Sequence, residues 1–301
     1  MKGAPLSPGA PRCPLAPGPT SAVDHRLMSR SSALDTVRAM RIDILLVRHP
    51  ADRVSPVIPA MIEHMEEHGA TVRRLYPDEG ALAAPTPETT DLLILKAKTP
   101  AALEVARSAH EAGVRCFNPY PVTELCRDKV ATTMALQEHG VPVPETWTVQ
   151  DLADLERELA GGPLIVKPVR GSQGQGVEVV RTVEDLRALD YGQDAVMAQR
   201  FMTPDGPDRK IYRIGDEVFC VERVWPPTSY EDKLGRLVEL PPAVEAVARA
   251  CGDALGIDVY GVDVIEHQGE PYVVDLSSFP GFKGVPDAGR RLGAHVLSQR
   301  G

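Results

Sequence analysis

The stretch "GPLIVKPVRGSQGQGVEVV", residues 162–180, decides the interpretation of this chain. An apolar run carries one lysine, Lys167, and three glycines follow within six residues: Gly171, Gly174 and Gly176. Lysine is seldom buried without a partner, and glycine lets backbone N–H groups approach a phosphate closely. The stretch therefore predicts a phosphate-binding loop. Its alternatives are a flexible hairpin turn and a lysine on an exposed edge strand.

Two better-known phosphate loops do not fit this stretch. A P-loop has Lys and then Ser or Thr directly after its last glycine, where this chain has Val177 and Glu178. A Rossmann loop opens a helix. Here the β-branched run "VEVV" follows Gly176, and the next helix-capping signal is Thr182. The glycines are therefore expected at the tip of a β-hairpin.

The bulk composition sets the class of protein. With 301 residues, 43% hydrophobic and 25% charged, the chain resembles a soluble globular protein of two or three lobes. Its net charge of −9 argues against general nucleic-acid binding. The apolar run "IDILLV" is too short to span a membrane. Five cysteines without CxxC or zinc-site spacing favour a reduced, cytoplasmic location.

Residues 1–39 differ from the rest of the chain. They are rich in Pro, Gly, Ala and Ser, lack the apolar segment of a secretory signal, and are predicted to be disordered. Met40 directly precedes the first expected strand, which raises the hypothesis that translation starts there. The intact mass of the native protein tests that hypothesis.

Strands and helices alternate over residues 40–121, which predicts an N-terminal lobe with an open parallel α/β sheet. The expected strands are residues 41–47, 71–76, 91–96 and 114–119, and the expected helices are residues 56–69 and 100–113. No GxGxxG motif follows the first strand, which argues against a Rossmann dinucleotide site there.

The second half of the chain changes pattern. A helix is expected over residues 124–140, because Cys126, Val130 and Met134 recur every four residues. "TVQDL" at Thr148 and "TVEDL" at Thr182 resemble capping boxes that begin helices. From about residue 195 strands dominate. The exceptions are a helix at 242–256 and a hairpin at 260–276 that turns around Gln268 and Gly269.

Two carboxylates lie within the apolar strands of that hairpin. Asp263 and Asp275 are each flanked by Val, Ile or Leu, and carboxylates in such runs are costly unless they are paired or bind a metal. Hard oxygen ligands suit Mg²⁺. Ser277 shares a strand face with Asp275 and is either a third ligand or a turn residue. The alternative is that each Asp is solvated at a strand face.

The order Lys129, Lys167, glycine hairpin, Lys210, Asp263 and Asp275 resembles the ATP-grasp superfamily over about residues 41–297. The resemblance implies an α/β fold with α+β lobes that clamp ATP. The N-terminal lobe (residues 40–121) would precede an ATP-grasp domain (residues 122–301). That domain would divide into a central lobe of about residues 122–195 and a C-terminal lobe of about residues 196–301.

The resemblance also implies roles for individual residues. Lys129 and Lys167 would contact the ATP phosphates, and the hairpin with Gly171, Ser172, Gln173, Gly174 and Gly176 would cover them. Gln199, Arg200 and Phe201 would border adenine, although the family often has Glu where Gln199 stands. Lys210 stands where the glutamate-adding ligases usually have Arg and would assist the transferring phosphate, and Arg223 would be a second basic catalytic residue lining the cleft. Asp263, Asp275 and Ser277 would hold Mg²⁺ or Mn²⁺.

The motif "VVDLSSFPGFKGVP" leaves two reactions open. Its Asp275 and Phe-Pro turn are similar to the ATP-grasp inositol polyphosphate kinases, whereas the loop "GSQGQGV" is similar to the glutamate-adding ligases. The leading hypothesis is a carboxylate–amine ligase that uses an acyl phosphate. The alternatives are a kinase for a hydroxylated anionic acceptor and a nucleotide-binding module without activity.

The acceptor is less well specified than the nucleotide. We expect a small molecule or a peptide. Lys96 and Lys98 end a strand of the N-terminal lobe and are either anion ligands or solvated residues. Arg48 and His49 are equally ambiguous. A homodimer is an expectation from the superfamily alone.

Overall fold

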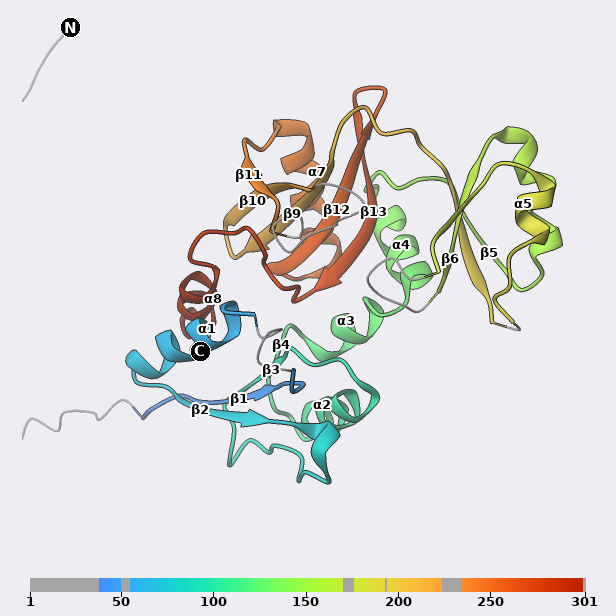
Figure 1. Ribbon diagram of the computed structural model, residues 1–301. Helices are drawn as coiled ribbons and strands as arrows, with labels where there is room; N and C mark the ends of the chain where they lie inside the picture. Colours follow the sequence, from blue (N-terminus) through green and yellow to red (C-terminus); the bar gives the residue numbers. More distant parts are fainter. Residues whose placement is uncertain (1–37, 50–54, 170–175, 193, 224–233, 300–301) are drawn as a thin grey trace, which may run out of the picture. The chain divides into compact units, whose positions relative to one another are not determined.

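The computed structural model describes residues 38–49, 55–169, 176–192, 194–223 and 234–299 (Figure 1). The chain divides into a unit of residues 1–38 and a unit of residues 39–301, and all the described helices and strands belong to the second unit. The predicted disordered tail therefore lies outside the described residues, except at its last two positions.

The first sheet is the parallel sheet that the alternating pattern predicts. Its strand order is β2-β1-β3-β4, and every neighbouring pair is parallel. The strands are β1 (Arg41–Leu45), β2 (Thr71–Leu75), β3 (Leu92–Leu95) and β4 (Cys116–Phe117), and the helices among them are α1 (Val57–Glu67), η2 (Pro77–Glu79) and α2 (Pro100–Glu111). Thr99 caps the N-terminus of helix α2: its hydroxyl accepts a hydrogen bond from the Ala102 N–H.

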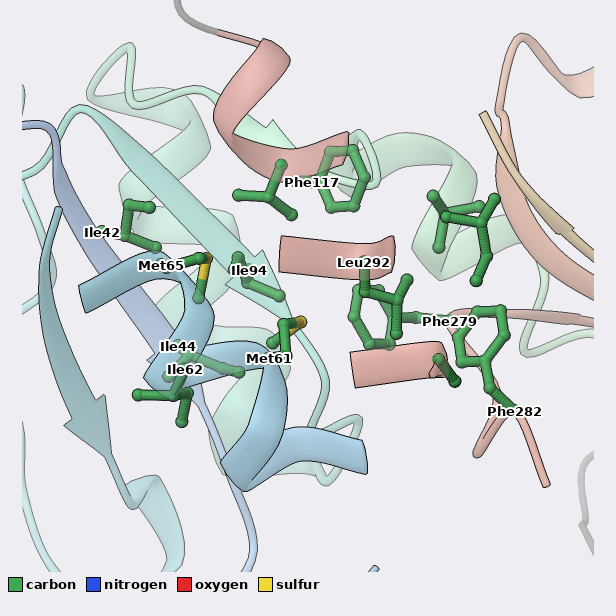
Figure 2. Close-up of a cluster of buried hydrophobic side chains, with 14 of the residues drawn as sticks. Ile42, Ile44, Met61, Ile62, Met65, Ile94, Phe117, Phe279, Phe282 and Leu292 are labelled. Carbon is green, nitrogen blue, oxygen red and sulfur yellow. The ribbon is translucent and has the colours of Figure 1, made fainter. Parts of the chain in front are cut away.

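The core beside this sheet includes residues from the far end of the chain (Figure 2). Apolar side chains of the sheet and of α1 share one buried cluster with the segment after residue 278, including Ile42, Ile44, Ile94, Met61, Met65, Phe279, Phe282 and Leu292. Helix α8 (Ala288–Ser298), which the sequence pattern does not single out, packs against α1. Glycine is needed at that contact, because a Cβ on Gly289 would lie 2.6 Å from the Val57 carbonyl oxygen.

The second sheet is antiparallel, with the order β5-β8-β6-β7. Its strands are β5 (Thr146–Val149), β6 (Leu164–Pro168), β7 (Glu178–Val180) and β8 (Val196–Arg200). The short helices between these strands in sequence are η3 (Leu152–Leu155), η4 (Glu158–Gly161) and α5 (Val183–Arg187). The capping box of Thr182 with Asp185 at α5 is confirmed. The one expected at Thr148 is wrong, because Thr148 lies within β5 and Asp151 itself caps η3.

The third sheet is also antiparallel and has the order β11-β10-β9-β12-β13. Its strands are β9 (Asp208–Ile214), β10 (Glu217–Arg223), β11 (Arg236–Val238), β12 (Val259–His267) and β13 (Glu270–Ser278). The predicted hairpin is confirmed: Gln268 (φ 54°) and Gly269 (φ 81°) form its left-handed turn. Helices α7 (Pro242–Leu255) and α4 (Lys129–Glu138) pack against this hairpin.

The single helix expected over residues 124–140 is wrong. The segment contains the end of α3 (Tyr120–Leu125) and a separate helix, α4 (Lys129–Glu138). The break occurs because Asp128 adopts an extended conformation, and its carboxylate caps α4 through the Ala131 N–H at 2.9 Å. Lys129 is therefore the first residue of a helix.

The sheets do not follow the expected lobe boundary at residue 195 in every detail. Strand β8 pairs with both β5 and β6, so residues 196–200 belong to the same sheet as the glycine hairpin. The division of the chain into lobes remains a prediction.

Candidate active site

Three charged side chains form a row across the third sheet. Lys210 of β9 is opposite Asp263 of β12, and Asp263 is opposite Asp275 of β13. Residues opposite one another on neighbouring strands share a face, so the register places all three together. The Lys210 ammonium, almost completely buried, donates a hydrogen bond to Asp263 Oδ2 at 2.7 Å. The prediction that the hairpin brings the two aspartates side by side is confirmed.

A β-bulge beside Asp275 connects this row to the second sheet. The register shifts after Asp263, which pairs with Asp275 while Val264 pairs with Val273, so Val274 is the extra residue. The carbonyl of Val274 accepts a hydrogen bond from Lys167 Nζ at 3.1 Å. Lys167 of β6 is itself 6% exposed, so this contact is largely shielded from water.

Gln199 is the second partner of Lys167. Its Oε1 accepts a hydrogen bond from Lys167 Nζ at 2.8 Å, and its Nε2 donates to the Thr146 hydroxyl at 3.0 Å. Gln199 is 1% exposed, so both ends of the amide are fixed by these bonds. The side chain of Gln199 therefore positions Lys167, a function that sequence reasoning missed.

The charges of the two sheets influence one another. Burial raises the pKa of Asp275, and the neighbouring Asp263 carboxylate raises that pKa further, while Lys210, Lys129 and Lys167 oppose the shift. Burial also lowers the pKa of Lys167 to about 8, opposed by Asp275. Three lysines and two carboxylates from five elements thus lie within electrostatic reach of one another.

Lys129 is anchored through its backbone. Its N–H donates to the Val169 carbonyl oxygen at 3.2 Å, which ties the first turn of α4 to the end of β6. Lys129 and Asp275 also line the same small cavity between α4 and β13. The structure therefore brings Lys129 to Asp275 from a helix that precedes both antiparallel sheets in sequence.

The glycine hairpin is described only at its ends. The expectation that a strand follows Gly176 is confirmed by β7, which pairs antiparallel with β6. Gly176 has φ 68°, and the Tyr191 hydroxyl donates to its carbonyl oxygen at 2.6 Å. This contact of Tyr191 left no pattern in the sequence. The other predicted loop residues, Gly171, Ser172, Gln173 and Gly174, lie outside the described residues.

Arg200 and Phe201 follow Gln199 at the end of β8. Their backbone N–H groups donate to the carbonyl oxygens of Glu145 and Pro163, at 2.8 and 2.9 Å. The Arg200 guanidinium lies over the Trp147 ring, 4.9 Å from its centroid. These bonds hold the segment between β5 and β6, and the expected role in binding adenine stays a prediction.

Arg223 and Ser277 lie on the same sheet as the charged row. Arg223 is opposite Asp208 and donates to the Tyr212 hydroxyl, so part of its guanidinium is engaged within the sheet. Ser277 is opposite Gly261 and shares the face of Asp275 by the strand period. Their predicted catalytic and metal-binding roles stay predictions.

Lys96 and Lys98 are half-buried, and both contact the segment that follows Asp275. Lys96 Nζ donates to the Pro280 carbonyl oxygen at 2.9 Å, and Lys98 Nζ donates to that of Ser278. Burial lowers the pKa of each lysine to about 8. Both therefore fix the loop that follows Asp275. Arg48, by contrast, is 65% exposed and pairs with Glu79.

Gly261 provides the space in which the charged row packs. A Cβ there would lie 2.9 Å from Pro280 Cγ and 3.2 Å from Lys210 Cε. We expect Gly261→Ala to lower the free energy of unfolding by about 1–3 kcal/mol, because neither neighbour can move without disturbing the row. Urea unfolding measures this. Gly206→Ala is the control, since nothing lies within 4 Å of a Cβ added at Gly206. Equal unfolding midpoints for the two variants would contradict the expectation.

Comparison with known proteins defines the class first. The ATP-grasp domain protein from Sphaerobacter thermophilus, 20% identical, aligns over 85% of this chain and 99% of its own with a TM-score of 0.68. D-cycloserine synthetase aligns over 86% of this chain and 99% of its own, with 16% identity and a TM-score of 0.69. The three-sheet architecture is thus the ATP-grasp fold, as the sequence predicts.

The sequence then specifies the family. Residues 126–298, more than half of the chain, match the RimK-like ATP-grasp domain. This protein belongs to that family. A probable alpha-L-glutamate ligase of Shewanella amazonensis is 28% identical over 198 residues, which are 61% of this chain and 66% of the relative. Across the described residues, no helix has the length and apolar character that crossing a membrane requires.

Proposed function

We propose that this chain is an ATP- and Mg²⁺-dependent carboxylate–amine ligase acting on a small molecule or a peptide. The observation that carries the proposal is the cluster of Lys129, Lys167 and Lys210 around Asp263 and Asp275. The likeness to a probable alpha-L-glutamate ligase supports a ligase as its use.

The proposed reaction has two steps. A substrate carboxylate oxygen bonds to the γ-phosphorus of ATP, and the bond to the β-phosphate oxygen breaks with its electrons leaving on ADP. The amine nitrogen then attacks the acyl carbon of the acyl phosphate, loses a proton and expels phosphate. No protein nucleophile is needed, so the chain would act by positioning groups and stabilising charge.

The lysines would stabilise the phosphate charge. Lys167 is held by Gln199 and the Val274 carbonyl, so its ammonium is fixed in place before nucleotide arrives. Lys129 at the start of α4 adds charge and the N-terminal end of a helix dipole. Lys210 would meet the transferring phosphoryl group beside Asp263. The glycine hairpin and the segment of Gln199 to Phe201 would enclose the nucleotide.

The carboxylate pair fits a divalent metal. Asp263 and Asp275 are opposite each other across two strands, and their mutual repulsion favours a cation between them. Two hard oxygen ligands suit Mg²⁺, which takes its remaining ligands from water and phosphates, and Mn²⁺ would also fit. When bound, the metal would neutralise charge on the β- and γ-phosphates. Ser277, on the same face, would complete the set.

A kinase is the second candidate. The Phe-Pro turn at Phe279 and Pro280 resembles that of the inositol polyphosphate kinases, and Lys96 and Lys98 fix its position. The same lysines and carboxylates would serve a hydroxyl that attacks the γ-phosphate.

The four cysteines among the described residues are all free thiols, which supports a reducing cytoplasmic location for either activity.

The stoichiometry of phosphate separates the two activities. The chain is incubated with ATP and with amino acids and peptides that supply the carboxylate and the amine. We expect ADP and free phosphate to be released in equal amounts, and only when an acid and an amine are both present. Phosphate-release and ADP assays on the full chain measure this. A stable phosphorylated product without free phosphate would overturn the ligase proposal in favour of the kinase. Absence of acceptor-dependent turnover across acids, amines and polyols would contradict both.

A further inference from the structure

The C-terminal end of α1 gathers three metal-ligating side chains that the proposed ligase reaction does not use. His64, Glu67 and His68 are spaced three and four residues apart, so they lie on one face of the helix. One potential ligand atom from each lies within 4.8 Å of the others. Atoms this close can bind a single ion after small side-chain rotations.

Each imidazole is held by its surroundings. The His68 Nδ1 lies 2.7 Å from the His64 carbonyl oxygen. A carbonyl oxygen only accepts, so Nδ1 carries the proton and Nε2 presents its lone pair. A metal-binding histidine generally has this arrangement, in which the second nitrogen donates to a carbonyl or carboxylate. The two imidazole rings are 4.1 Å apart between centroids.

His64 is restrained by the helix packed against it. A Cβ on Gly293 of α8 would lie 2.9 Å from His64 Cδ2 and 3.2 Å from His64 Cβ. Glycine at this position thus lets α8 approach the imidazole closely and limits where the ring can lie. The contact between α1 and α8 therefore orients one of the three ligands in advance (Figure 1).

We propose that His64, Glu67 and His68 form a surface site for a borderline transition-metal ion such as Zn²⁺. Two imidazole nitrogens and one carboxylate oxygen are the donor set that Zn²⁺, Co²⁺, Ni²⁺ and Cu²⁺ prefer, while Mg²⁺ prefers oxygen ligands alone. With three protein ligands, the fourth position is open to water. The donor chemistry thus distinguishes this site from the carboxylates of β12 and β13.

Bound metal would stabilise the contact between α1 and α8. The ion would tie the last turn of α1 to its C-cap residue, His68, and would fix the ring against which α8 packs. An ion that binds the folded state alone raises the melting temperature. For a chain of this size we expect about 5–10 °C at a hundredfold excess over the Kd.

The test is a Zn²⁺ titration of the full chain by calorimetry, with Mg²⁺ in excess to occupy the oxygen-ligand site. We expect one Zn²⁺ per chain, with affinity at least about 100-fold weaker in His68→Gln and in Glu67→Gln. Both positions are exposed, so these variants should fold normally, which circular dichroism checks. Co²⁺ should give visible absorption bands without the sulfur charge-transfer bands of cysteine ligation.

His139→Gln is the matched control. His139 is likewise an exposed helix-terminal histidine whose Nδ1 contacts the carbonyl oxygen four residues earlier, at 2.8 Å from Ala135. The residue four positions before His139 is Ala135, whereas the residue four positions before His68 is His64. His139 therefore lacks a second imidazole beside it, and the His139→Gln variant should bind Zn²⁺ normally. Absence of Zn²⁺ binding in excess Mg²⁺, or binding unchanged in His68→Gln and Glu67→Gln, would overturn the proposal. Neither result depends on the ligase activity.

Discussion

Replacing Asp275 with asparagine is expected to lower acceptor-dependent ATP turnover by about 10³-fold, because one of the two carboxylates proposed to bind the metal is lost. The same substitution is expected to raise the melting temperature of the nucleotide-free protein. Burial and the facing Asp263 raise the pKa of Asp275, so its ionised form is unfavourable in the folded state.

The pH dependence distinguishes this explanation from a general effect of asparagine. A carboxyl group whose pKa is raised on folding binds more protons in the folded state, so its contribution to stability falls as pH rises from its unfolded pKa through its folded pKa. The gain in melting temperature of Asp275→Asn should therefore grow over that range. Thermal unfolding at several pH values, without Mg²⁺, measures it.

The control for Asp275→Asn is Asp216→Asn, at an exposed position in the turn between β9 and β10. This variant should keep both its turnover and its melting temperature. Turnover within threefold of the parent for Asp275→Asn would contradict the proposed metal site. A melting temperature that falls at every pH would contradict the electrostatic explanation.

The affinity for ATP is expected to fall as pH rises above about 8. The pKa of Lys167 is lowered to about 8 by burial, so its ammonium is mostly charged below this pH and mostly neutral above it. Only the charged form attracts phosphate, so binding above pH 8 requires proton uptake. The Kd should then rise by up to about tenfold per pH unit. Calorimetry with a non-hydrolysable ATP analogue between pH 7 and pH 9.5 measures this.

Lys167→Arg separates this lysine from other titrating groups. Arginine remains charged throughout the range, so the variant should show a flatter pH profile even if its affinity at pH 7 is reduced. Gln199→Leu removes one of the two hydrogen-bond acceptors of Lys167 and should weaken nucleotide binding at pH 7. A pH profile of Lys167→Arg as steep as that of the parent would rule out Lys167 as the source.

The side chains that meet at the candidate site could be predicted from sequence because their positions depend on strand patterns. Lys167, Asp263 and Asp275 each interrupt an apolar run, and a polar residue in such a run is costly without a partner. The glycine hairpin was predictable from the strand "VEVV" that follows it. In both cases the local residue pattern determines the strand, and the pairing of strands into sheets then places their side chains near one another.

Other features depended on contacts that no local pattern reports. The four-residue spacing of Cys126, Val130 and Met134 favoured one long helix, yet Met134 is 53% exposed and Asp128 interrupts the segment as the cap of a new helix. The bulge at Val274 is invisible in sequence, because a valine fits a regular strand equally well. Gln199 was expected beside adenine, and only the packing of β6 against β8 shows that its amide bonds to Lys167.

The contacts of Lys96 and Lys98 limit how freely the domains of this family can be exchanged. Both lysines lie before residue 126, where the match to the family begins, yet they bind carbonyl oxygens at residues 278–280 within it. An N-terminal lobe grafted from a relative would have to provide equivalent donors for those carbonyl oxygens. Chimeric enzymes should therefore be most active when the same donor supplies both the N-terminal lobe and the loop at residues 278–280 that this lobe contacts.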